Sequence, residues 1–253
     1  MDGEVDVAAV AGLIGEPARA KVLVALADGR ALAASTLAAE ASVAASTISE
    51  HLARLVDGGL VAVEPSGRHR YYRLAGPGVA EALEALARLA PAAPVRSLRQ
   101  ATHAQAIRSA RTCYDHLAGR LGVALCDALV EKGIVLSEPS GHPDGDPSSD
   151  PGDDPVLGAG RALRFELTAT GRHTLAELGV ALEPPRRRPL VRYCVDWSER
   201  RPHLAGWLGA ALCSRLEQLG WVVRAERRVV RVTDTGRRAL ADQLGVRLHT
   251  PAR

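Results

Sequence analysis

Several features are scarce in this 253-residue sequence, and their scarcity excludes whole classes of protein. Aromatic residues make up only 3%, so the core must be built from Ala, Leu and Val. No apolar run approaches the roughly 18 residues of a membrane span, and the acidic start is unlike a signal peptide. Four cysteines without a secretion signal are typical of reduced thiols. We therefore expect a cytoplasmic protein with no membrane segment and no disulfide framework.

Net charge is low as well, at +3 from 32 basic and 29 acidic residues. Six of the acidic residues lie in Ser137–Pro155, which has neither Lys nor Arg and is rich in Pro, Gly and Ser. Because this segment has no large apolar side chain to bury, we predict a disordered acidic insertion over residues 137–160. The rest of the chain is clearly basic, which permits nucleic-acid binding without demanding it.

The N-terminal section predicts two helices joined by a short turn. Ser35-Thr36 resembles an N-cap pair for a helix ending at Ala41, and a second helix is expected over 45–57 before Gly58-Gly59. On this second helix Ile48, Leu52 and Leu55 form one apolar stripe. Its opposite face is polar, as a helix in the major groove requires, and consists of Ser46, Thr47, Glu50, His51 and Arg54.

A β-hairpin is predicted directly after the helix pair. Its strands span residues 60–64 and 68–74 around a turn at Pro65-Ser66-Gly67, with Val61/Val63 and Tyr72/Leu74 facing inward. The tip presents Arg68, His69 and Arg70, which suit contacts to phosphates or the minor groove.

These segments together resemble one known family. Val43–Leu55, Gly59-Leu60-Val61 and Gly67–Leu74 look like the ArsR family of winged helix-turn-helix repressors, over about residues 7–90. The resemblance implies that 45–57 is the recognition helix, that 61–74 is the wing and that the protein is a homodimer on double-stranded operator DNA. Dimer contacts would come from Pro77–Leu89, through Val79, Leu83, Leu86 and Leu89, and from the helix near Val7–Leu13.

Individual DNA contacts follow from side-chain chemistry. Thr47, His51 and Arg54 suit base edges, whereas Ser46 and Ser49 suit phosphates. The predicted DNA-binding set is Ser46, Thr47, Ser49, His51, Arg54, Arg68, His69 and Arg70. The alternative is a protein-interaction module that binds no duplex, with the basic hairpin as a solvated edge.

The metal sites of many ArsR relatives are not supported by this sequence. The helix before the recognition helix reads Leu37-Ala-Ala-Glu-Ala41 and has no cysteine, and Pro77–Leu89 offers only Glu81 and Glu84.

An internal repeat organises the C-terminal half. Cys113–Cys126 matches Cys194–Cys213, and each copy continues through a turn and a hairpin into a last helix. We interpret the copies as two tandem winged-helix-like units. The predicted fold is mainly α with small β-hairpin wings, divided into an ArsR-type domain at 1–93 and repeats at 94–183 and 190–253.

The repeat also pairs residues that bind metals. Cys113, Asp115 and His116 match Cys194, Asp196 and His203 in type and order. Cys113 and His116 would share one face of a helix, while an insertion between Asp196 and His203 breaks that spacing. If the copies pack around a pseudo-two-fold axis, both sets converge on a metal ion such as zinc or on a thiol pair. The structural alternative is that the cysteines are small buried hydrophobes, which we expect for Cys126 and Cys213.

A small-molecule effector is a further option, because Trp197, Trp207, Trp221 and Tyr193 fall together in the second copy. Core packing is the alternative role for these aromatics. An enzyme is not expected, because no phosphate loop or hydrolase elbow is present. The sequence thus predicts a dimeric transcriptional repressor whose operator affinity is set by a signal sensed in the C-terminal repeats.

Overall fold

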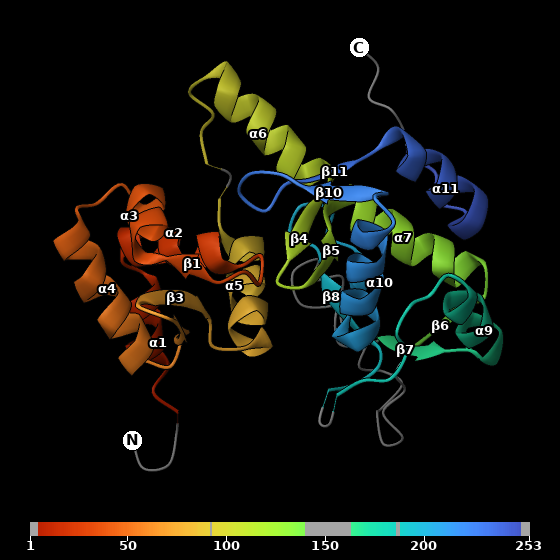
Figure 1. Ribbon diagram of the computed structural model, residues 1–253, viewed down its shortest axis with the longest axis horizontal. Coiled ribbons are helices and arrows are strands. Elements are labelled where there is room, and N and C mark those ends of the chain that lie inside the picture. Colours follow the sequence, from red (N-terminus) through yellow and green to blue (C-terminus); the bar gives the residue numbers. More distant parts are fainter. Residues whose placement is uncertain (1–4, 92, 140–162, 186–187, 249–253) are drawn as a thin grey trace, which may run out of the picture. The chain divides into compact units, whose positions relative to one another are not determined.

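The computed structural model describes residues 5–91, 93–139, 163–185 and 188–248 (Figure 1). The chain divides into two compact units, Met1–Leu83 and Glu84–Arg253, and the boundary falls inside helix α5 (Pro77–Leu89). In the described part of the chain, no helix has the length and apolar character needed to span a bilayer.

The first unit is a helix-turn-helix with a wing, as the sequence predicts. Its sheet has the order β1-β3-β2, and β2 and β3 form the wing. The elements are α1 (Val7–Ile14), α2 (Pro17–Leu26), β1 (Leu32–Ala33), α3 (Ala34–Ala41), α4 (Ala45–Asp57), β2 (Val61–Ser66) and β3 (His69–Leu74).

Helix α4, the expected recognition helix, has the predicted bounds and the predicted buried stripe. Ile48, Leu52 and Leu55 are at most 1% exposed, so the polar face of α4 is turned outward. Gly59 follows the helix with φ +70°, the left-handed conformation expected there. The predicted N-cap of α3 is wrong, because α3 begins at Ala34 after Ala33, with no side-chain cap.

The wing differs from its prediction in two details. Strand β2 continues through Ser66, which pairs with His69, so the loop is Gly67-Arg68 rather than Pro65-Ser66-Gly67. Gly67 takes φ +57°, the conformation that a two-residue hairpin loop requires at this position. Val61 and Leu74 are buried as predicted, whereas Val63 is 37% exposed because it lies toward the solvated tip.

The second unit contains the end of α5 and then α6 (Leu98–Ser109), after which both repeat copies follow the same order of hairpin, helix, hairpin and helix. The first copy contains β4 (Arg111–Cys113), β5 (His116–Ala118), α7 (Gly119–Glu131), β6 (Val135–Pro139), β7 (Leu163–Leu167) and α9 (Ala169–Glu177). The second copy contains β8 (Arg192–Val195), β9 (Pro202–Ala205), α10 (Gly206–Gln218), β10 (Val222–Arg224), β11 (Val230–Val232) and α11 (Asp234–Leu244).

The two copies share a single hydrophobic core. Leu121 and Leu129 of α7 and Leu208 and Leu216 of α10 are all nearly inaccessible and belong to one cluster. The apolar faces of both central helices are therefore buried together, which ties the copies into one unit.

The predicted acidic insertion falls within the β6–β7 hairpin. Residues 140–160 lie outside the described part of the chain. Its predicted start is wrong, because Ser137 and Glu138 pair with Phe165 and Arg164 and so belong to β6. The backbone pairing with β7 extends the strand further than the side-chain composition suggests.

Candidate functional site

The outward face of α4 presents most of the predicted DNA-contacting side chains. Ser46, Ser49 and Arg54 are exposed and Thr47 is half-buried. Ser49 Oγ donates to Ala45 O at 3.0 Å, and Arg54 lies 3.6 Å from Glu50 one turn earlier. These exposed pairs are weak and leave the side chains able to rearrange on a ligand.

His51 is the exception on this helix, and the prediction that it faces outward is wrong. Its Nδ1 lies 3.6 Å from Glu16 Oε2, and only 16% of its side chain is exposed. Glu16 caps α2 by accepting from the backbone N–H groups of Arg19 and Ala18, and these bonds lower the pKa of its carboxyl. His51 therefore packs against the cap of α2 rather than on the polar face.

The wing tip carries the predicted basic side chains. Arg68, His69 and Arg70 are exposed, and Arg73 and Glu64 form an ion pair farther along the strands. An exposed cationic tip beside an exposed polar helix is the arrangement that contacts DNA phosphates and base edges in winged helix-turn-helix proteins.

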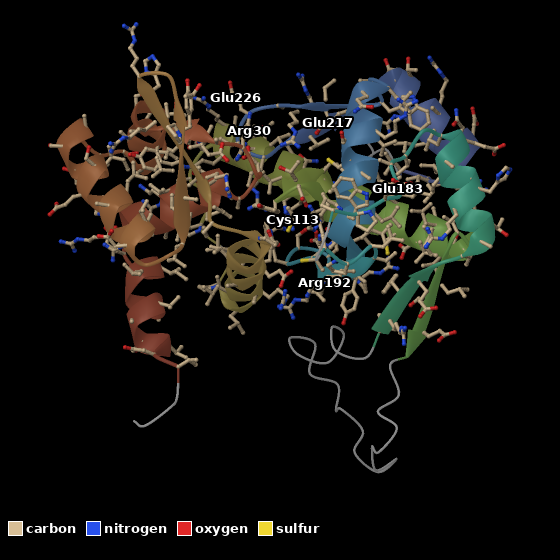
Figure 2. All side chains as sticks on the ribbon, turned by 60° about the horizontal axis from the view of Figure 1, so that its bottom comes forward. Arg30, Cys113, Glu183, Arg192, Glu217 and Glu226 are labelled. Carbon is tan, nitrogen blue, oxygen red and sulfur yellow. The ribbon has the colours of Figure 1, made fainter. Side chains whose placement is uncertain are left out.

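The second unit brings four of the predicted metal-binding residues together. One ligand atom from each of Cys113, His116, Cys194 and His203 lies within 4.8 Å of every other one. Cys113, labelled in Figure 2, pairs across β4–β5 with His116, and Cys194 pairs across β8–β9 with His203. Each hairpin thus supplies one sulfur and one imidazole.

The predicted helical spacing of Cys113 and His116 is wrong. A hairpin loop of Tyr114 and Asp115 separates them, with Tyr114 at φ +58°. In the second copy residues 196–201, which include most of the six-residue insertion at 197–202, form a longer loop, closed by the bond from Asp196 N to Arg201 O at 2.9 Å. Because opposite residues on paired strands are neighbours whatever the loop length, the insertion preserves the Cys194–His203 pair.

The two copies pack the cluster through equivalent glycines. A side chain at Gly209 of α10 would lie 3.1 Å from His116 Cβ, and one at Gly122 of α7 would lie 3.6 Å from His203 Cβ. Each helix therefore approaches the histidine of the other copy closely, and the ring centroids of His116 and His203 are 5.1 Å apart. Four of the six residues in the two predicted sets therefore come together, and Asp115 and Asp196 do not.

The cluster is buried, and three of its imidazole nitrogens lack a hydrogen-bond partner in the described part of the chain. Cys113, His116 and His203 are 2%, 7% and 0% exposed, while Cys194 is half-buried. Among the described residues, His116 Nε2 and both ring nitrogens of His203 have no hydrogen-bond partner. Buried polar atoms are normally paired, so these nitrogens fit a metal ion.

The two aspartates lie beside the histidines and are not among the four grouped ligand atoms. Asp115 Oδ1 lies 3.3 Å from His116 Nδ1, and its Oδ2 accepts from Arg188 at 2.7 Å. Asp196 Oδ2 lies 4.0 Å from His203 Nδ1 and accepts from Gly119 N at 2.6 Å. A carboxylate hydrogen-bonded to an imidazole orients it, and only Asp115 makes such a bond, to His116.

Electrostatics around the cluster differ from residue to residue. Burial raises the pKa of Asp196, but the charge of Arg111 and hydrogen bonds from Ser198 and Gly119 outweigh it and lower that pKa to about 2. Burial and the charge of His116 lower the pKa of His203 well below its ordinary value, so this imidazole is neutral.

Cys113 and His116 influence each other's charge. A hydrogen bond with Cys194 and burial raise the pKa of Cys113 well above its ordinary value. Burial lowers the pKa of His116, but its neighbours Cys113 and Asp115 outweigh this effect and raise the pKa. The Cys113 thiol is neutral because its sulfur is buried beside a second thiol.

The other two cysteines are core residues. Cys126 of α7 and Cys213 of α10 are buried in the shared hydrophobic cluster. Burial raises the pKa of each thiol to about 12, which makes both unreactive.

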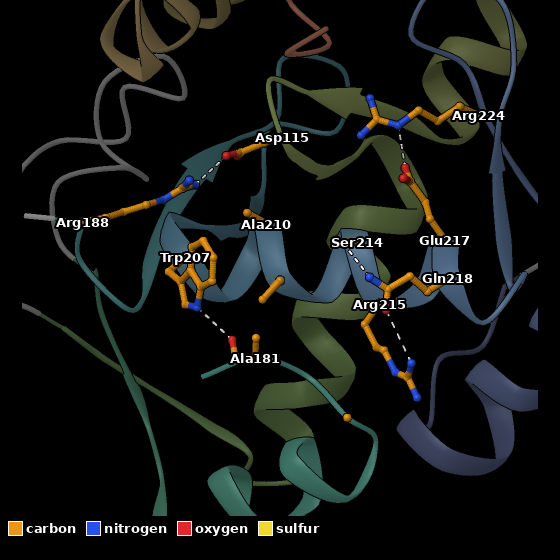
Figure 3. Close-up of a pocket in the computed structure, with 12 residues that line it drawn as sticks. Asp115, Ala181, Arg188, Trp207, Ala210, Ser214, Arg215, Glu217, Gln218 and Arg224 are labelled. Carbon is orange, nitrogen blue, oxygen red and sulfur yellow. Dashed lines mark hydrogen bonds and ion pairs between the residues drawn. The ribbon is translucent and has the colours of Figure 1, made fainter. Parts of the chain in front are cut away.

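The tryptophans do not share one pocket. Trp221 is buried in the core, and Trp197 lies under Arg111 at 4.7 Å from the guanidinium to the ring centroid. Trp207 lines a cavity of about 440 Å³ with Arg188, where its Nε1 donates to Ala181 O at 2.8 Å (Figure 3). The aromatic clustering in the sequence therefore has three separate structural causes.

Two residues beside the cluster were missed by the sequence interpretation. Arg111 is fully buried, and its Nη2 donates to Asp196 Oδ2 at 2.9 Å. Glu84 of α5 is 4% exposed and accepts from Arg228 at 2.7 Å. The sequence contained a signal for each residue. Arg111 stands two positions before Cys113, as Arg192 stands two positions before Cys194 in the other copy. Glu84 lies one helical turn after Ala80, which is buried.

The first unit defines the chain as a winged helix-turn-helix protein of the DNA-binding class. A family model described as a helix-turn-helix domain matches residues 14–64. The chain is 37% identical over 246 residues to YdfF of Bacillus subtilis (strain 168), described as an uncharacterized HTH-type transcriptional regulator, covering 96% of this chain and 99% of YdfF. The chain belongs to the ArsR family of helix-turn-helix transcriptional regulators, which are not enzymes.

Solved structures with some likeness cover only part of the chain. The homodimeric winged helix-turn-helix domain of Mb0332 from Mycobacterium bovis is 32% identical, over 35% of this chain and 88% of its own, with a TM-score of 0.30. The cadmium sensor CMTR from Mycobacterium tuberculosis is 32% identical, over 37% of this chain and all of its own, with a TM-score of 0.29. At these TM-scores neither likeness carries weight for this chain.

Proposed function

We propose that this regulator is a homodimeric repressor that binds double-stranded operator DNA through α4 and the wing. The exposed polar face of α4 and the exposed cationic wing tip support this role. Removing His51 from the predicted set leaves Ser46, Thr47, Ser49, Arg54, Arg68, His69 and Arg70 as the proposed contacts.

Exposed apolar side chains support the homodimer. Val7 and Val10 of α1 are 68% and 42% exposed, and Leu86 and Leu89 of α5 are 45% and 66% exposed. Apolar residues on two helices that the ArsR resemblance assigns to dimerisation suit burial against a second copy of the chain.

We further propose that Cys113, His116, Cys194 and His203 bind one divalent metal ion such as zinc, as the signal that sets operator affinity. The observation that carries this proposal is the buried histidine nitrogens without partners beside two cysteines. Two thiolates and two neutral imidazoles balance a charge of +2, so the loaded site would bury no net charge. Tetrahedral zinc places its ligand atoms roughly 3.3–3.8 Å apart, which requires only a small contraction of this cluster.

We also propose a domain division and a cellular location for this regulator. Residues 94–183 and 190–253 would be two tandem winged-helix-like units following a domain at 1–93, and the repressor would act in the cytoplasm. Their matching element order supports the division, with the metal ligands supplied by the hairpin that opens each unit.

The test uses full-length protein purified without chelator. We expect one zinc per chain by elemental analysis, and a DNA fragment recovered from genomic DNA whose gel-shift affinity changes when zinc is removed. Failure to enrich any duplex would refute the DNA-binding role, and a metal-free protein that does not bind added zinc would refute the metal site.

A second candidate signal is oxidation of the cysteine pair. The Cys113 and Cys194 sulfurs lie within 4.8 Å of each other, a separation that modest movement would close to a disulfide. Hydrogen peroxide would oxidise both thiols, forming the S–S bond and two molecules of water. A mass loss of two hydrogen atoms in a peptide pair linking these residues, without zinc binding, would favour this candidate over the metal.

A further inference from the structure

Glu84 links helix α5 to both hairpins of the Cys/His cluster. Its Oε1 accepts from Arg228 Nη2 at 2.7 Å, and its Oε2 lies 3.5 Å from Arg111 Nη2. Arg111 in turn donates to Asp196 Oδ2, two residues after Cys194. Glu84 therefore reaches the second ligand hairpin through one intervening side chain.

The same carboxylate reaches the first ligand hairpin through Arg228. Arg228 Nε donates to Thr112 O at 3.0 Å, and Thr112 N donates to Arg228 O at 2.9 Å. Thr112 immediately precedes Cys113. Arg228 holds these bonds with φ +68°, a backbone conformation uncommon for a non-glycine residue.

A second residue of α5 also holds the cluster. Arg88, one turn after Glu84, donates from Nη1 to Val195 O at 3.3 Å. Val195 lies between the proposed ligand Cys194 and Asp196. Helix α5 therefore contacts the segment after Cys194 in two ways: Arg88 bonds to the backbone of Val195, and Glu84 reaches the side chain of Asp196 through Arg111. Movement of Cys194 onto a metal ion would therefore displace groups that α5 contacts.

Burial makes this network sensitive to displacement. Arg111 and Asp196 side chains are fully buried, and those of Glu84 and Arg228 are 5% and 12% exposed. The carboxylates of Glu84 and Asp196 balance the charges of the Arg111 and Arg228 guanidinium groups. Displacing any one of the four would leave a buried charge without its partner. Glu84 Oε2 has no hydrogen bond within the described part of the chain, so its contact with Arg111 is the loosest in the network.

We infer that Glu84 and Arg111 are positioning residues that couple occupancy of the Cys/His site to α5, and through this helix to the DNA-binding unit. Only Ala75 and Gly76 separate the wing strand β3 from the start of α5. The inference rests on the proposed function, because it requires that zinc binds and acts on operator affinity. By thermodynamic linkage, operator DNA must then change zinc affinity by the same factor.

The experiment compares wild type, Glu84→Gln and the matched control Glu81→Gln, an exposed glutamate on the same helix. Operator affinity is measured by titration with and without zinc chloride, and zinc affinity by chelator competition with and without operator. Thermal unfolding of each variant shows whether it folds. Arg88→Gln provides an independent variant if Glu84→Gln is unfolded.

In wild type and Glu81→Gln we expect zinc to change operator affinity on the order of 5–150-fold. In Glu84→Gln zinc should change operator affinity by no more than about twofold, and operator DNA should change zinc affinity by no more than about twofold. Zinc should still bind to this variant. An unchanged ratio in folded Glu84→Gln and Arg88→Gln would overturn the coupling but leave the proposed function intact. A wild-type protein that binds no zinc would instead overturn the metal-sensing part of the proposed function.

Discussion

The proposed DNA contacts and the proposed metal ligands occupy opposite environments. Arg68 and Arg70 are exposed to solvent, where ion pairs are weak and water can replace a lost partner. Cys113 and His203 lie in the interior, where each polar atom needs a specific partner. Single changes should therefore have modest effects in the first unit and large effects in the second.

The largest effect is expected at a proposed ligand. Cys194→Ser should lower zinc affinity by at least about 100-fold, more than the loss of a supporting residue does. Chelator competition measures the change. Cys126→Ser is the matched control, because Cys126 is a buried core thiol outside the cluster, and equal zinc loss in both variants would disprove the ligand assignment.

A packing change beside the cluster should come next. In Gly209→Ala the new Cβ would lie 2.6 Å from Leu204 O and 3.1 Å from His116 Cβ, so the helix must shift. We expect a loss of up to about 3 kcal/mol in the free energy of unfolding, measured in urea. Gly12→Ala of α1 meets no atom within 4 Å and should not destabilise. Equal stability of the two variants would contradict the close packing around Gly209.

A charge removed from the wing should have a smaller effect. Arg68→Ala should weaken operator binding by about 1 kcal/mol and reduce the slope of log affinity against log salt by about 1. A gel-shift titration at several salt concentrations gives both values. Arg238→Ala, an exposed arginine of α11, should leave them unchanged, and a wild-type slope in Arg68→Ala would remove this residue from the proposed surface.

The smallest effect concerns the cap of α2. Glu16 accepts from the N–H groups of Arg19 and Ala18, which lowers its pKa from the ordinary 4.5. The carboxylate therefore stabilises the folded protein above pH 4.5, and this contribution is lost as the pH falls through the lowered pKa. Glu16→Gln should cost less than about 1 kcal/mol at pH 7. Urea unfolding at pH 7 and pH 3 should show the difference shrinking in acid, and a constant difference would mean that charge plays no part.

Much of the first unit follows from local sequence. The bounds of α4 and α5 match their predictions because stripe spacing, glycine stops and proline starts act within a few residues. The wrong orientation of His51 has a longer-range cause. His51 packs against Glu16 of another helix, and no periodicity within α4 reports that contact.

The cluster was predictable in composition but not in form. A Cys-x-x-His spacing fits one helix face and a two-residue hairpin equally well, and only the pairing of β4 with β5 distinguishes them. Asp115 and Asp196 carry the chemistry of ligands, but their positions beside the histidines depend on Arg188 and Arg111.

The sequence by itself determined the winged helix-turn-helix class, the repeat and the types of residue that the cluster contains, because these depend on short-range pattern. Tertiary structure decided which of those residues meet. Arg111 and Asp196 are 85 positions apart in the chain, and Glu84 joins them from α5. Such contacts arise because the apolar faces of α7 and α10 bury each other and bring the two hairpins together, and no local pattern encodes that packing.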